Sequence, residues 1–169
     1  MPWEVAPPAH TRFPSILHGT PRATFENSHP AHSHINLSLP MNFLVVDDNR
    51  LLNRFLVTYL RSKGHACSSL TDGSKVESWL NLNPCDAVIL DIGMPKIDGL
   101  SLISIIRAHH TDLPIIIFTG LGYDEEMMQA ARYAGANGYV SKGLGPSEIY
   151  SAVMRVLSAP VNPPAQATS

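Results

Sequence analysis

Cysteine is scarce in this sequence, which has only Cys67 and Cys85 among its 169 residues. Two cysteines exclude a disulfide framework of several bridges and a four-cysteine zinc site, and the two do not form a Cys-x-x-Cys motif. Both lie beside apolar residues, where free cysteine behaves as a small buried hydrophobe. We therefore expect two reduced thiols that fill space and carry no chemistry.

Clustered positive charge and long apolar runs are also missing. The formal net charge is −2, and the basic patch typical of nucleic-acid-binding domains is absent from the sequence. No stretch approaches the roughly 18 consecutive apolar residues of a membrane-spanning helix, and the first residues do not resemble a secretory signal. These absences predict a cytoplasmic protein that contacts neither nucleic acid nor membrane.

Residues 1–40 differ in composition from the rest of the chain. They hold seven of the 14 prolines and five of the 8 histidines, without helical or strand periodicity, so we predict a disordered extension. His29, His32 and His34 offer only weak, nonspecific metal binding, because no cysteine or carboxylate completes a tetrahedral set. An alternative is that Met41 is the natural start and residues 1–40 are not native, which the intact mass of the native protein distinguishes.

From residue 41 to residue 158, apolar runs alternate with amphipathic stretches, and a flexible tail of residues 159–169 comes after them. This alternation is typical of an α/β domain built on a parallel sheet. A helical stripe of apolar residues follows each run, with Gly64 and Gly135 as stop signals and Asp98 as a helix cap. We therefore predict a doubly wound, five-stranded parallel sheet with five helices. The predicted strands cover residues 43–46, 66–70, 87–90, 115–118 and 138–141.

Chemically useful side chains stand at the ends of four predicted strands. Asp47 and Asp48 end the first, Asp91 the third, Thr119 the fourth and Lys142 the fifth. Singly, each has an ordinary explanation as a strand end, a turn residue or a solvated charge. Because ligands bind open parallel sheets at the carboxyl ends of the strands, their shared position predicts one site.

Two adjacent carboxylates need a positive partner, since charges about 4 Å apart repel by roughly 4 kcal/mol at an effective dielectric constant near 20. Successive residues of a strand point to opposite faces, so Asp47 and Asp48 cannot contribute identically.

Four segments, in order and at strand spacing, identify a family: LVVDDN, VILDIGMPKIDG, IIIFTG and AGANGYVSK. Through them residues 41–158 resemble the receiver domains of two-component response regulators, in particular single-domain regulators of the chemotaxis type. The resemblance implies a flavodoxin-like fold with strand order 2-1-3-4-5. It also implies a phosphorelay protein that takes a phosphoryl group from a histidine kinase or histidine phosphotransfer protein and hydrolyses it slowly, rather than an enzyme acting on external substrates.

The resemblance also assigns roles at the metal site. Asp91 is the phosphoacceptor, and its aspartyl phosphate forms in a magnesium-dependent reaction. Asp48, Asp91 and the backbone carbonyl of Gly93 would bind Mg²⁺ or Mn²⁺, which suit an all-oxygen site. Asp47 would act through a metal-bound water.

Three further residues would carry the phosphoryl group and the switch. Lys142 would pair with Asp91 and then with its phosphoryl group, while the Thr119 hydroxyl would donate to a phosphoryl oxygen. Tyr139 would then rotate inward and change the surface that binds a downstream protein or a second copy. A strand aromatic with no switching role is the alternative for Tyr139.

One position departs from the family pattern. Gly143 stands where the family usually has proline, and glycine leaves the loop after Lys142 conformationally freer.

Three other functions stay open. The chain could instead be a phosphorylation-independent interaction module, or the truncated remnant of a DNA-binding regulator, since GPSEIYSAVMRVL is similar to receivers that precede such domains. A metal-dependent phosphatase is disfavoured because Gly93 occupies the place of a second carboxylate.

Overall fold

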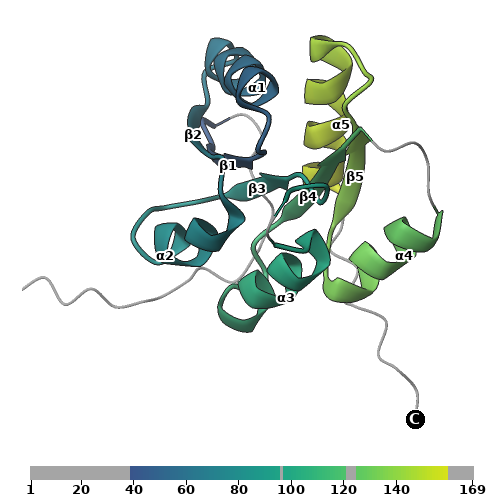
Figure 1. Ribbon diagram of the computed structural model, residues 1–169. Coiled ribbons are helices and arrows are strands. Elements are labelled where there is room, and N and C mark those ends of the chain that lie inside the picture. Colours follow the sequence, from purple (N-terminus) through teal and green to yellow (C-terminus); the bar gives the residue numbers. More distant parts are fainter. Residues whose placement is uncertain (1–38, 96, 121–124, 160–169) are drawn as a thin grey trace, which may run out of the picture. The chain divides into compact units, whose positions relative to one another are not determined.

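The computed structural model describes residues 39–95, 97–120 and 125–159, and these form a five-stranded parallel sheet with helices on both faces (Figure 1). The strand order is β2-β1-β3-β4-β5, which confirms the predicted order and the doubly wound fold. The strands are β1 (Asn42–Val46), β2 (Ala66–Leu70), β3 (Ala87–Leu90), β4 (Ile115–Thr119) and β5 (Gly138–Ser141).

Each helix lies between two strands or follows the last one. The helices are α1 (Arg50–Ser62), α2 (Val76–Leu80), α3 (Gly99–His109), α4 (Glu125–Ala134) and α5 (Pro146–Ser158). Asp98 caps α3, as predicted, by accepting the Leu100 and Ser101 amides. Gly64 and Gly135 follow α1 and α4 with φ of 91° and 109°, a conformation that glycine adopts without strain.

The sheet separates two apolar layers, because side chains of a strand alternate between its faces. Phe43 and Val45 of β1 pack in one layer with α1 and α5, whereas Leu44 and Val46 pack in the other with α2, α3 and α4. All four are at most 1% exposed, so β1 is buried on both sides. Covered faces of this kind explain the continuous apolar runs of the sequence.

The sequence pattern predicts a second helix that opens at Asp72-Gly73 and ends at Asn83-Pro84, but the observed helix is shorter. A 3₁₀ turn at Gly73–Lys75 precedes it, and the α-helix has only five residues. The Asp72 carboxylate accepts hydrogen bonds from the amide and hydroxyl of Ser74, which tightens the start. The carboxamide of Asn83 then donates to the Trp79 carbonyl and ends the segment before Pro84.

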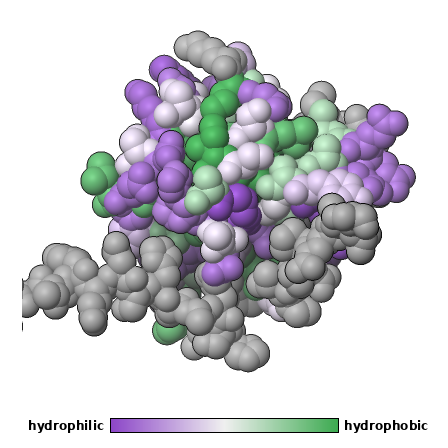
Figure 2. Space-filling view, turned by 90° about the horizontal axis from the view of Figure 1, so that it is seen from below, coloured by the Kyte–Doolittle hydropathy of each residue, from purple (hydrophilic) through white to green (hydrophobic). Residues whose placement is uncertain are grey.

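Some of the predictions concern residues outside the described ranges. These are residues 1–38 of the predicted extension, with its three clustered histidines, and all of the predicted tail except Ala159. Among the helices that the structure describes, none has the length and apolar character to cross a bilayer. On the face seen in Figure 2, hydrophobic residues form small groups between hydrophilic ones.

The two thiols lie close to the sheet. Cys67 is buried and Cys85 is partly buried. Burial raises the pKa of Cys67 to about 11 and that of Cys85 to about 12. Both thiols are therefore protonated near neutral pH, so their nucleophilic thiolate form is scarce.

Candidate functional site

The register of the sheet brings the acidic strand ends together. Val46 of β1 is paired with Leu90 of β3, and the Asp91 amide donates to the Val46 carbonyl at 2.8 Å. Asp47 and Asp91 therefore follow two adjacent parallel strands and lie at the same edge of the sheet, at the carboxyl ends of the strands. On the other side of β1, the Asp47 amide donates to the Leu70 carbonyl of β2 at 3.1 Å.

Lys142 reaches this edge from β5 and lies between two carboxylates. Its Nζ donates to Asp91 Oδ2 at 2.6 Å and lies 2.8 Å from Asp47 Oδ2. The Lys142 amide donates to the Thr119 carbonyl, which fixes the start of the side chain beside the end of β4. The ammonium also lies 5.7 Å from the centre of the Phe118 ring, within the range of a cation–π contact.

Burial and neighbouring charges shift the pKa values of Asp47 and Lys142. Desolvation raises the pKa of Asp47, and the nearby Asp91 adds to this, while Lys142 and the Asn49 amide oppose it. Burial alone would lower the pKa of Lys142, but hydrogen bonds and charge from Asp47 and Asp91 outweigh it and raise the pKa. Lys142 is therefore an ammonium that compensates buried negative charge.

Asp47, Asp48 and Asp91 form an acidic cluster whose carboxylate oxygens lie within 4.8 Å of one another. Asp47 is fully buried and its Oδ1 accepts the Asn49 amide at 2.8 Å, whereas Asp48 is exposed. Oxygen donors at this spacing fit a hard divalent cation, because Mg²⁺ needs few protein ligands and keeps several waters. Asp48 faces solvent, so its carboxylate is accessible to a hydrated ion.

Gly93 leaves the space beside Asp91 open. Its amide donates to Asp91 Oδ1 at 2.9 Å, so it lies against the carboxylate. A Cβ at this position would stand 3.4 Å from Asp91 Oδ1 and 3.9 Å from Oδ2. A Cβ here would therefore be in ordinary van der Waals contact with both oxygens of Asp91, without a clash.

Thr119 and Tyr139 lie on neighbouring strands. Thr119 ends β4, is 2% exposed, and is paired with Ser141 of β5. Tyr139 is paired with Ile117 and packs, partly buried, against the layer that contains α3 and α4. Gly143 directly follows Lys142 and is exposed. Lys142 reaches both carboxylates even though glycine, and not the proline usual in the similar family, comes after it.

Sequence reasoning missed two asparagines that support the acidic residues. The Asn49 side chain caps α1 by accepting hydrogen bonds from the Leu51 and Leu52 amides. The backbone amide of Asn49 donates to Asp47 Oδ1. An asparagine directly before a helical stripe is a recognisable cap. Asn53 is 3% exposed and donates to the Asp47 and Leu70 carbonyls, and its signal was a polar residue on the apolar face of a helix.

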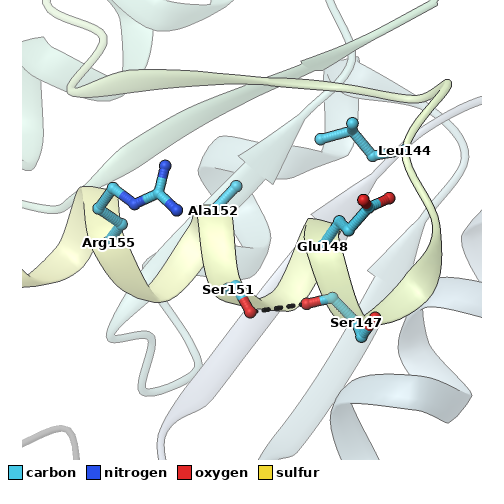
Figure 3. A pocket seen from close by; sticks show the side chains of 6 residues that line it. All are labelled: Leu144, Ser147, Glu148, Ser151, Ala152 and Arg155. Atoms are coloured by element: carbon cyan, nitrogen blue, oxygen red, sulfur yellow. Dashed lines mark hydrogen bonds between the residues drawn. The ribbon is translucent and has the colours of Figure 1, made fainter.

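A surface hollow of about 340 Å³ runs along α5 (Figure 3), and its lining includes none of the three acidic residues. Its wall combines one leucine with small and charged side chains, and the Ser151 hydroxyl donates to the Ser147 carbonyl. The candidate site lies outside this hollow and is recognised by its chemistry. The hollow is lined by Leu144, Ser147, Glu148, Ser151, Ala152 and Arg155.

Comparison with known proteins gives a concordant result. The family model described as response regulator receiver domain matches residues 43–154. Transcriptional regulatory protein PhoP of Escherichia coli K12 is 32% identical over 117 residues, which cover 69% of this chain and 52% of that protein. QseB of Haemophilus influenzae is 32% identical over 109 residues, covering 64% and 49%. The chain thus spans about half the length of these curated relatives.

Solved structures show the same architecture. A putative response regulator from Chloroflexus aurantiacus is 32% identical, with a TM-score of 0.65 over 72% of this chain and all of the other. The chemotaxis response regulator CheY4 of Vibrio cholerae has a TM-score of 0.66 at 22% identity, over 70% of this chain and 99% of the other. The second likeness concerns the fold alone.

Proposed function

The chain belongs to the response regulator receiver family, and on this premise we propose that it is a phosphorylation-controlled signalling domain. Asp91 accepts a phosphoryl group from the phosphohistidine of a histidine kinase or phosphotransfer protein. One observation carries the proposal: Lys142 Nζ lies 2.6 Å from Asp91 Oδ2 and 2.8 Å from Asp47 Oδ2, beside the exposed Asp48. A nucleophile, a cation and metal-binding oxygens thus meet at one sheet edge.

The acidic cluster has the donor chemistry of a Mg²⁺ or Mn²⁺ site. Asp48 and Asp91 would hold the ion together with the backbone carbonyl of Gly93, and Asp47 would act through a water. The bound ion supplies charge that offsets the phosphoryl oxygens. Asp47 has a second role in this scheme, because its Oδ2 also contacts the Lys142 ammonium and so holds it beside Asp91.

The proposed transfer exchanges one bond for another. A carboxylate oxygen of Asp91 attacks the phosphorus, the P–N bond to the donor imidazole breaks, and the imidazole nitrogen keeps the electron pair. Lys142 passes from the Asp91 carboxylate to the phosphoryl oxygens, so its positive charge stays within the site. Attack by water on the same phosphorus releases inorganic phosphate and restores Asp91.

The proposed switch uses the two neighbouring strands. The Thr119 hydroxyl donates to a phosphoryl oxygen, and Tyr139 changes its packing against the layer of α3 and α4 as Thr119 moves. The phosphoryl group thereby shifts an existing equilibrium between two surfaces, one of which binds a downstream protein or a second copy. The tight burial of Thr119, at 2% exposure, supports a coupled rather than an isolated movement.

Intact mass spectrometry tests the proposal. The protein is incubated with acetyl phosphate and Mg²⁺, and we expect one added phosphoryl group that is absent in EDTA and absent in Asp91→Asn. Asp98→Asn is the matched control, because asparagine keeps the cap of α3 while removing a carboxylate that is not part of the acidic cluster. Labelling of Asp91→Asn, or a wild type that is never labelled, would contradict the proposal and favour a phosphorylation-independent interaction module.

A further inference from the structure

We propose that Asn53 is a positioning residue for the divalent cation, because it orients the peptide group that joins Asp47 to Asp48. The inference rests on the proposed cation site and adds a residue that touches neither the cation nor the phosphoryl group. Asn53 lies on α1, and its side chain donates a hydrogen bond to the backbone of the acidic pair.

Packing does not account for an asparagine at this position. Asn53 is 3% exposed and shares the buried face of α1 with Leu56, Val57 and Leu60. An apolar side chain is the usual occupant of such a position. The Asn53 Oδ1 atom is buried and accepts no hydrogen bond within the described residues. A buried amide with an unused acceptor points to a task for its donor end.

The donor end of Asn53 is fully used. Nδ2 donates to the Asp47 carbonyl at 3.1 Å and to the Leu70 carbonyl at 3.0 Å. Both partners only accept, so the carboxamide must present its nitrogen to them, and the opposite orientation would set oxygen against oxygen. The Leu70 carbonyl also accepts the Asp47 amide at 3.1 Å. Asn53 therefore joins α1 to the ends of β1 and β2.

The Asp47 carbonyl belongs to the peptide group that also contains the Asp48 nitrogen. With the Asp47 amide held by Leu70 and the Asp47 carbonyl held by Asn53, the backbone of the acidic pair is fixed on both sides. Asp47 then points inward, where its Oδ2 lies 2.8 Å from Lys142 Nζ, and Asp48 points to solvent. The peptide orientation thus sets the relative directions of two of the three carboxylates.

A fixed direction matters for the cation more than for the fold. Mg²⁺ requires near-octahedral geometry, so carboxylates that must first be ordered bind it less tightly. Loss of a group that orients metal ligands without touching the metal typically weakens metal affinity by about 10- to 100-fold. Without the Asn53 amide, the peptide between Asp47 and Asp48 loses the hydrogen bond to its carbonyl and is less firmly held, so the cation must order it on binding.

The test compares cation affinity in three variants. Asn53→Leu removes the donor and fills its space, Asn53→Ala removes the donor but leaves room for a water, and Val57→Ala is the control. Val57 lies on the same buried face of α1, is 7% exposed, and has an apolar side chain that cannot hydrogen-bond to the acidic pair. Mn²⁺ is titrated into each unphosphorylated full-length protein, and free Mn²⁺ is measured by electron paramagnetic resonance. Urea unfolding in EDTA gives the stability of each variant.

We expect Asn53→Leu to bind Mn²⁺ about 10-fold or more weakly than the wild type, with Asn53→Ala between them. Val57→Ala should lose stability but keep wild-type affinity. Wild-type affinity in Asn53→Leu would overturn the inference and leave the cation site intact. If Asn53→Leu does not fold, Asn53→Ala decides by the same criterion. A wild type that binds no Mn²⁺ would overturn the cation site itself, and the inference with it.

Discussion

At the scale of single residues, the central feature is the division of labour between Asp47 and Asp48. They are neighbours in sequence, yet Asp47 is fully buried beside Lys142 and Asp48 is exposed. The alternation of a strand predicts opposite directions for the two. It does not predict that Asp47 is buried against an ammonium, because that contact depends on the position of Lys142, which directly follows β5.

Replacing Lys142 tests how much the Lys142 ammonium stabilises the fold by compensating the charge of the buried carboxylates. Lys142→Met keeps the length of the side chain but leaves Asp47 and Asp91 facing each other without compensation. We expect the free energy of unfolding in EDTA to fall by about 3 kcal/mol, as for a broken buried ion pair. Urea denaturation measures it, with Lys75→Met on an exposed turn as the control, expected to change stability by less than about 0.5 kcal/mol. Equal stability of the two variants would show that the pairing contributes nothing.

His65 makes a second residue-scale prediction, which concerns pH. It is 7% exposed, accepts the Met41 amide at Nδ1, and has Nε2 3.0 Å from Tyr150 Oη. Because the amide only donates, Nδ1 must be unprotonated, and Nε2 donates to the tyrosine. Burial lowers the pKa of His65 below its ordinary value of 6.5.

A lowered histidine pKa means that the unfolded chain binds the proton more readily than the folded one. The stability contributed by neutral His65 is therefore complete above pH 6.5 and is lost as the pH falls through the folded-state pKa. As the pH falls below about 6.5, the free energy of unfolding should fall by at most about 1.4 kcal/mol per pH unit, the limit for one proton. His65→Phe should lack this component, while His109→Gln on the exposed surface should retain it. An unchanged pH profile in His65→Phe would assign the effect elsewhere.

At the scale of elements, the strands and their ends could be predicted because each strand is a continuous apolar run with a polar stop. The predicted strand 115–118 gains only Thr119, and that of 43–46 gains only Asn42. The second helix could not be bounded in this way. Its start depends on side-chain hydrogen bonds of Asp72 and on the close approach of Gly73 to Ile97, where a Cβ would stand 2.6 Å from Cγ2.

Arg107 joins elements at the opposite end of the sheet and gives an element-scale prediction. Its guanidinium donates to the carbonyls of His110, Leu113 and Gly135 and to Asn137 Oδ1. The end of α3 is thereby tied to the connection between α4 and β5.

Arg107→Lys should lower the free energy of unfolding by about 2 kcal/mol, because an ammonium cannot reach all of these acceptors and leaves partly buried carbonyls unpaired. Thermal or urea denaturation measures the change. Arg132→Lys on the exposed side of α4 is the control, with an expected change within about 0.5 kcal/mol. If both variants unfold at the same denaturant concentration, the Arg107 hydrogen bonds do not stabilise the fold.

At the scale of the whole molecule, cation binding and folding stability should be coupled, because the acidic cluster unites residues from two strands only in the folded chain. A ligand that binds only the folded state adds about 1.4 kcal/mol at ten times its dissociation constant. We expect Mg²⁺ to raise the melting temperature of the wild type. Asp48→Asn should melt higher than the wild type in EDTA, since one repelling charge is gone, and should not respond to Mg²⁺. A response equal to that of the wild type would remove Asp48 from the site.

The sequence predicted a candidate site from residues at the ends of strands, but it did not predict that Asn53 would donate to the Asp47 and Leu70 carbonyls. Asn53 shares its helix face with leucines and valine. The reason for a polar side chain there is visible only in the folded structure, where it donates to carbonyls at the ends of β1 and β2. Pairwise tertiary contacts of this kind are set by the whole fold and have no fixed sequence spacing.

The central claim is that Asp91 carries the phosphoryl group, and chemical mapping of the modified residue tests it most directly. Protein treated with acetyl phosphate and Mg²⁺ is reduced with borohydride, which converts an aspartyl phosphate to homoserine and leaves free carboxylates unchanged. Peptide sequencing by mass spectrometry then locates the homoserine. We predict homoserine at position 91 alone, and only when Mg²⁺ was present. Homoserine at position 47 or 48, or at no position, would contradict the account.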